Sequence, residues 1–139
     1  MLVVMALKEP ILVATITTLS IPLTYAAYHQ FWHIYGTMLS MLMTGLVYHS
    51  SNNPISLRMD HAAILQFAYM CYVEGRQLDL LWLTSYAFLY SGIVYIGGYS
   101  TNRFAFSPSY LESRVYHGLI HLHIAAIVSY GIYLKSLVA

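Results

Sequence analysis

Four ionisable residues of this chain have types and positions that could form a metal centre. His117 and His121 stand four residues apart in a long apolar stretch near the carboxyl end of the 139-residue chain. Residues four apart lie on one face of a helix, so both imidazoles can reach one metal ion. His49 ends an earlier apolar stretch and Asp60 lies near the start of the next one. Ionisable side chains in such stretches are costly, which makes each of them a candidate site residue.

The chemistry of this set would be that of a catalytic zinc ion. Three neutral imidazoles, from His49, His117 and His121, leave the fourth tetrahedral position of zinc to water. Zinc lowers the pKa of such a water to about 7, so hydroxide is available at neutral pH. Asp60 could hydrogen-bond the water or a ligand ring and act as the general base.

Each of these residues also has a structural explanation that the spacing leaves open. Histidines four residues apart often serve in helix packing, and His29 with His33 forms a second such pair, which we expect at a membrane interface without a carboxylate nearby. His49 could simply reach toward an interface. Asp60 could be the buried partner of a cationic side chain, namely Arg58, Arg114 or His61.

The composition is that of a membrane protein. Hydrophobic residues make up 59% of the chain and charged residues 8%, with a mean hydropathy of +0.63, whereas a soluble domain has about 25% charged residues. So few charges cannot cover a water-soluble globule, which excludes a soluble single-domain enzyme. The net charge of +1 and the lack of a Lys/Arg run exclude nucleic acid as a partner. Cys71 is the only cysteine, so no intrachain disulfide can form.

Helices must position the candidate residues, and the apolar stretches predict five of them. A spanning helix needs about 20 mainly apolar residues. Asn53 can cap the third helix and Pro54 can open it, while Ser109 and Glu112 form a capping box before the last. We therefore predict an all-α, integral membrane helical bundle that forms a single transmembrane domain over residues 1–139, with spans at about 11–27, 31–49, 55–73, 79–96 and 113–134.

Turn residues mark the breaks between these helices. The first two helices have only Tyr28, His29 and Gln30 between them, so a merged helix remains possible there. The next turns are expected at 74–78 and, as the longest connection, at 97–108, where glycine, asparagine and proline are frequent.

The number of crossings predicts the orientation of the chain. Five crossings put the candidate metal residues in one leaflet. They also divide the cations into two groups, with Lys8, Arg58, Arg103 and Arg114 on the amino-terminal side and Arg76 and Lys135 on the other. The positive-inside rule then favours a cytoplasmic amino terminus.

Three segments resemble the motifs of a known membrane superfamily. They are Tyr48-His49-Ser50, the run LRMDHAAI at 57–64, and His117-Gly118-Leu119-Ile120-His121. The superfamily contains hemolysin III, the progestin/adipoQ receptors and the alkaline ceramidases, and the match is closest to hemolysin III. In those proteins Ser-x-x-x-His ends one helix, an Asp opens the next, and His-x-x-x-His lies on the last. The resemblance implies that His49, His117 and His121 bind zinc and that Asp60 holds or activates the zinc-bound water.

Two features depart from that superfamily. Gly45 stands where the motif has its serine, and Thr44 beside it is turned by about 100° around the helix. The chain also has five expected spans where the family has seven. A partner or a second copy of the chain, as in a homo-oligomer, could supply the two missing helices.

The resemblance implies a function as a zinc-dependent hydrolase that acts on a membrane lipid. Several family members cleave the amide bond of ceramide-type lipids, so the expected substrate is a lipid amide or ester. Two other functions use the same residues. The histidines could be axial ligands of haem in a membrane electron-transfer subunit, or zinc could merely stabilise a non-enzymatic receptor or scaffold. A buried carboxylate has an evident role beside a zinc-bound water and none beside haem, which favours the hydrolase.

Overall fold

The computed structural model describes residues 9–51 and 53–139. Within these residues the chain forms helices and no strand, so the prediction of an all-α fold is confirmed. The helices join into five rods. They are α1 (Pro10–Ile16), η1 (Thr17–Leu19) and α2 (Ser20–Tyr28) as the first rod; α3 (Trp32–Ser51); α4 (Pro54–Gln77); α5 (Leu81–Gly92), η2 (Ile93–Gly97) and α6 (Gly98–Thr101) as the fourth; and α7 (Tyr110–Ser136), which follows the short turn η3 (Phe104–Phe106).

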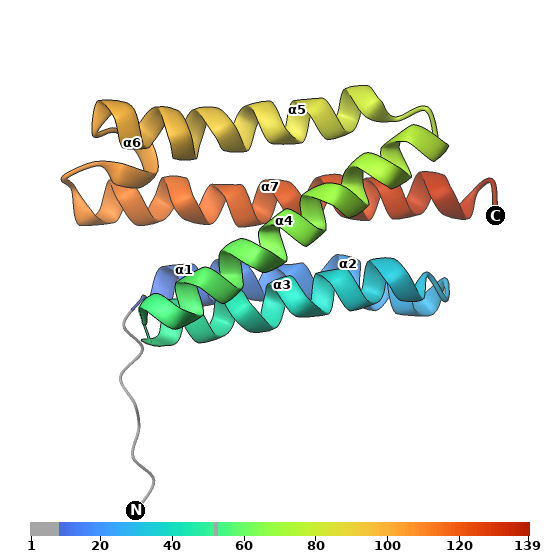
Figure 1. Ribbon diagram of the computed structural model, residues 1–139, viewed down its shortest axis with the longest axis horizontal. Coiled ribbons are helices and arrows are strands. Elements are labelled where there is room, and N and C mark those ends of the chain that lie inside the picture. Colours follow the sequence, from blue (N-terminus) through green and yellow to red (C-terminus); the bar gives the residue numbers. More distant parts are fainter. Residues whose placement is uncertain (1–8, 52) are drawn as a thin grey trace, which may run out of the picture.

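The rods pack as two pairs with α4 crossing between them (Figure 1). The first rod lies beside α3, and α7 lies beside α5. The first rod also packs against α7, so it joins α3 to the last helix. α4 begins on α3 and runs diagonally until its carboxyl end reaches α5. Apolar side chains from the first rod, α3, α4 and α7 form the main core, which includes Leu19, Met38, Phe67 and Ile132.

The starts of two helices agree with their sequence signals. Asn53 accepts a hydrogen bond on its side-chain oxygen from the backbone N–H of Ile55 at 2.8 Å, and Pro54 is the first residue of α4. Ser109 accepts a bond from the backbone N–H of Glu112 at 3.4 Å and so caps α7. The carboxylate of Glu112 bonds to the hydroxyl of Ser107 instead of completing the capping box.

The first two predicted helices are separate. α2 ends at Tyr28, and Gln30 takes a left-handed conformation with φ of 60°, which reverses the chain before α3. Inside the first rod the helix narrows to the 3-10 turn η1, just before Pro22. A proline cannot bond the carbonyl four residues earlier, and this local change of helix type accommodates it without breaking the rod.

The expected turn at 74–78 is wrong, because α4 continues to Gln77. The chain turns at the next three residues instead, with Asp79 in a left-handed conformation at φ of 56°. Glu74 explains the extra helical turn, since its carboxylate bonds to the side chains of His33 and Lys135. These contacts tie the end of α4 to the start of α3 and the end of α7, a tertiary effect that no local pattern contains.

The expected connection at 97–108 is also shorter than predicted. The fourth rod continues past residue 96 as the π-helical turn η2 and then α6, and it ends at Asn102, whose φ is 54°. Gly98 therefore lies inside a helix and is needed for a close approach. A Cβ atom there would lie 2.6 Å from the carbonyl oxygen of Arg103, where the chain folds back toward α7.

Two helices of the described residues are long and apolar enough to cross a membrane. They are the first rod, Pro10–Tyr28, and α7, Tyr110–Ser136. α4 is long enough as well, but charged side chains such as Arg58, Asp60 and Glu74 interrupt its apolar sequence. Length and composition therefore give two candidate spans in this part of the chain.

Candidate metal centre

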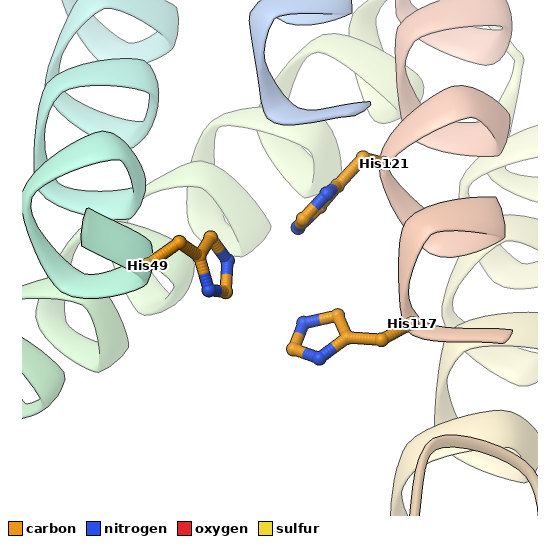
Figure 2. A group of neighbouring side chains, drawn as sticks. All are labelled: His49, His117 and His121. Atoms are coloured by element: carbon orange, nitrogen blue, oxygen red, sulfur yellow. The ribbon is translucent and has the colours of Figure 1, made fainter. Parts of the chain in front are cut away.

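Three histidines from two distant segments converge at one end of the bundle. His49 lies in the last turn of α3, and His117 and His121 lie near the start of α7 (Figure 2). The ring centroids of His49 are 5.2 Å and 5.3 Å from those of His117 and His121, which are themselves 5.1 Å apart. One ligand nitrogen of each ring lies within 4.8 Å of the other two. The three side chains could therefore bind one metal ion.

The first rod determines this convergence. It packs against both α3 and α7, whereas these two helices have no direct backbone packing within residues 9–51 and 53–139. The rod approaches α3 closely at Gly45, where a Cβ atom would lie 2.9 Å from Cδ1 of Ile16. Gly45 is one helical turn before His49. The close approach at Gly45 therefore helps to fix the position of the His49 ring along the bundle relative to the histidines of α7.

Burial and hydrogen bonding favour a metal over simple packing. His49 is 2% exposed and His121 is 7% exposed. Nδ1 of His121 lies 2.9 Å from the hydroxyl of Thr15, while the rings of His49 and His117 have no hydrogen-bond partner in the described part of the chain. Within the described residues, His49 and His117 have no nitrogen that is both fully buried and unpaired, so their nitrogens are open to a ligand such as a metal ion. Three nitrogen donors suit zinc among several transition metals.

Asp60 lies on α4, close to this end of the bundle but outside the three-histidine group. It is 8% exposed and accepts a hydrogen bond on Oδ1 from the hydroxyl of Thr44 at 3.2 Å. None of the three cationic side chains proposed as partners forms an ion pair with Asp60. Arg114 pairs with Glu9, and the side chains of Arg58 and His61 are exposed. Within the described residues Asp60 makes no ion pair, so its carboxylate remains available for chemistry.

Sequence reasoning did not predict the contact of Thr44 with Asp60 or that of Thr15 with His121. Thr44 reaches Asp60 although it stands one position away from the site of the motif serine, which is Gly45. A threonine five residues before His49 is a weak signal that could have suggested it. No signal points to Thr15, because its contact with His121 joins residues 106 positions apart.

An apolar cavity of about 400 Å³ adjoins the histidines. It lies among the first rod, α3, α4, the fourth rod and α7, and most of its lining is aliphatic or aromatic. Asp60, His117 and His121 line it at one end, and Glu74 and Lys135 line it at the other. The helical rise between His121 and Lys135 is about 21 Å, so the cavity follows much of the length of α7.

His29 and His33 do not form a second helical pair. His29 follows the end of α2, whereas His33 lies in α3, beyond the reversal of the chain. Nε2 of His33 is 2.6 Å from a carboxylate oxygen of Glu74, so the expectation that no carboxylate is nearby is wrong. His33 is thus engaged in a hydrogen bond and is a poor candidate for a haem ligand.

No protein-family model, curated protein or solved structure matches this chain. The fold and the site define an all-helical protein with a candidate three-histidine metal centre beside an apolar cavity.

Proposed function

We propose that this protein is a membrane-embedded, zinc-dependent hydrolase that cleaves an amide or ester bond of a lipid. One observation carries the proposal: two members of the three-histidine cluster, His117 and His121, line an apolar cavity of about 400 Å³, with Asp60 at the same end. Apolar cavities with a few convergent polar groups are typical of ligand sites, and this one suits a molecule with a polar head and a long apolar tail.

In this proposal all five rods cross the membrane and the amino terminus is cytoplasmic. The sequence composition supports a membrane location, and so do large apolar side chains on the outside of the bundle. Leu65, Trp82 and Leu89, on α4 and the fourth rod, are 62–72% exposed. Apolar surfaces of this kind are unfavourable in water and favourable in contact with lipid tails. The low share of charged residues, 8%, points the same way.

Zinc fits the donor set, because three neutral imidazoles in a buried site leave one coordination position for a reactant. When bound, zinc supplies Lewis-acid activation of a water molecule and of the acyl carbonyl. Asp60 accepts a proton from the attacking water on its carboxylate and returns it to the leaving nitrogen or oxygen as the acyl bond breaks. The hydroxyl of Thr44 holds that carboxylate in place. The cavity binds the lipid tail and excludes bulk water.

The resemblance to hemolysin III and the alkaline ceramidases supports the same proposal. The residues that match the motifs of that superfamily are the three clustered histidines and Asp60. The shortened architecture is consistent with this proposal, since the first rod, α3, α4 and α7 contain all residues given a role and α5 supplies cavity lining.

Metal analysis of the purified protein tests the proposal. We expect about one zinc per chain in the detergent-purified wild type and almost none in His121→Ala. His123→Ala is the matched control, because His123 lies on the same helix but packs against Tyr90, with ring centroids 4.1 Å apart. The control should retain zinc. A wild type without zinc would overturn the proposal. A visible absorption band from bound haem would instead support the alternative function as an electron-transfer subunit.

Hydrolysis is tested with the same preparations. We expect release of fatty acid from a long-chain lipid amide or ester, loss of this activity with a chelator, and recovery with added zinc. His121→Ala should be inactive and His123→Ala active. If zinc binds but no lipid amide or ester is cleaved, and His117→Ala loses its fold, then zinc only holds α3 to α7 and the protein is a scaffold.

A further inference from the structure

The hydroxyl of Thr15 has two kinds of contact that together fix the roles of its atoms. Oγ1 lies 3.0 Å from the backbone oxygen of Ile11 and 3.2 Å from that of Leu12, on its own helix. Both oxygens can only accept, so they favour a hydroxyl proton directed toward the backbone. Oγ1 also lies 2.9 Å from Nδ1 of His121, across the bundle. With its proton toward the backbone, Oγ1 can accept a hydrogen bond from Nδ1–H.

This bond determines which nitrogen of His121 can bind a metal. A neutral imidazole has one N–H and one lone pair. With the N–H at Nδ1, the lone pair is at Nε2. Metal-binding histidines usually donate their second N–H to a nearby acceptor, which fixes the tautomer and the orientation of the ring. The Thr15 contact has the form of that arrangement, although Thr15 belongs to a helix that provides no candidate ligand.

We propose that Thr15 is a positioning residue of the metal centre, which holds His121 in the tautomer and orientation required for binding through Nε2. The inference rests on the proposed zinc site and adds a residue to it. It also gives α1 a role in metal affinity, because the packing of α1 against α7 sets the distance between the Thr15 hydroxyl and the His121 ring.

Gly118 makes this contact possible. A Cβ atom at residue 118 would lie 2.9 Å from Cγ2 of Thr15 and 3.1 Å from Oγ1. Gly118 and His121 are three residues apart and therefore neighbours on one face of α7. A methyl group at residue 118 would push Thr15 away from the ring, so the small residue inside the His-x-x-x-His segment serves the approach of α1.

Zinc affinity, measured by competition with a chelator in detergent, tests the role of Thr15. Thr15→Val removes the acceptor and keeps the shape, and we expect zinc binding to weaken about 10- to 100-fold. Thr15→Ser keeps the hydroxyl and should bind zinc as the wild type does. Thr18→Val is the matched control, since Thr18 is half-buried one turn away and bonds only to the backbone oxygen of Thr15. It should have no effect.

The visible spectrum of the cobalt-substituted protein is the second measurement, because it reports ligand geometry directly. The spectrum should change in Thr15→Val and return in Thr15→Ser. Wild-type affinity and spectrum in Thr15→Val would overturn this inference and leave the zinc centre intact, whereas a wild type that binds no zinc would overturn both. If Thr15→Val loses its helical circular dichroism, the zinc affinity of Gly118→Ala tests the inference instead. Weaker zinc binding would support the inference, and unchanged binding would overturn it.

Discussion

The hydroxyl of Thr44 on α3 lies 3.2 Å from Oδ1 of Asp60 on α4 and 3.0 Å from the backbone oxygen of Ser40, so its proton is shared between these two acceptors. This bond connects the helix that contains His49 to the carboxylate that we propose as the general base. Asp60 is otherwise buried without an ion-pair partner among the described residues, so Thr44 contributes to fixing its orientation.

Asp60→Asn should separate catalysis from metal binding. The amide keeps the size of the side chain but cannot accept a proton, so hydrolysis should fall by about 10²- to 10⁴-fold while zinc content stays the same. Thr44→Val should reduce the rate of hydrolysis less, by about tenfold, and Thr44→Ser, which keeps the hydroxyl, should have the wild-type rate. Parallel rate and zinc measurements on each variant check this. A wild-type rate in Asp60→Asn would remove Asp60 from the mechanism.

The three histidines could be predicted because their positions leave a local signal. His117 and His121 share a helix face, and His49 ends an apolar helix, so counting the helices is enough to bring them to the same end of the bundle. The contacts that support them leave none. Thr15 reaches His121 only because the first rod packs between α3 and α7, which depends on the whole arrangement of helices.

Helix starts were predictable for the same reason, and helix ends were not. Asn53 and Ser109 cap their helices through bonds to residues two and three positions away. In contrast, α4 extends to Gln77 because Glu74 bonds to Lys135, which is 61 positions away. Turn residues alone therefore placed the end of this helix too early.

Gly131 offers a test of whether the cavity binds the lipid tail. It lies on α7, lines the cavity, and has open space where a side chain would extend. Gly131→Leu should fill part of the cavity and reduce cleavage of long-chain substrates by about 10- to 100-fold, while short-chain substrates and zinc content are unaffected. Gly36→Leu is the control, since Gly36 has equal space but lies outside the cavity lining. Equal losses for both chain lengths would argue against a tail in this cavity.

Glu9 and Arg114 form an ion pair that fastens the start of the first rod to α7. Nε and Nη2 of Arg114 donate to the two carboxylate oxygens of Glu9 at 2.5 Å and 2.6 Å, and the hydroxyl of Tyr110 donates to the same carboxylate at 3.3 Å. The Arg114 guanidinium holds the pKa of Glu9 below its usual value of 4.5. The charged carboxylate is therefore the form that stabilises the folded state.

Glu9→Gln should show the pH dependence of this pair. At pH 7 the variant should be less stable by about 1–3 kcal/mol, because a quarter of the Arg114 side chain is exposed and a fully buried pair is worth more. The contribution of a carboxylate with a lowered pKa is complete above its unfolded value and is lost as the pH falls through the folded one. Thermal unfolding in detergent should thus show a difference between wild type and variant that shrinks below about pH 4.5. A difference that is constant from pH 7 to pH 3 would contradict the assignment.

Gly97 and Gly98 are adjacent, and substituting each by alanine should have opposite effects. A Cβ atom at Gly98 would lie 2.6 Å from the backbone oxygen of Arg103, which cannot move without shifting the connection that leads into α7. Gly98→Ala should therefore lower the free energy of unfolding by about 1–3 kcal/mol. A Cβ atom at Gly97 meets nothing within 4 Å, so Gly97→Ala should be neutral or stabilising by up to about 1 kcal/mol, because alanine favours helix. Thermal unfolding followed by helical circular dichroism measures both. Similar stability of the two variants would mean that the chain from Thr101 to Phe106 does not fold back on Gly98, and the path into α7 would have to be redrawn.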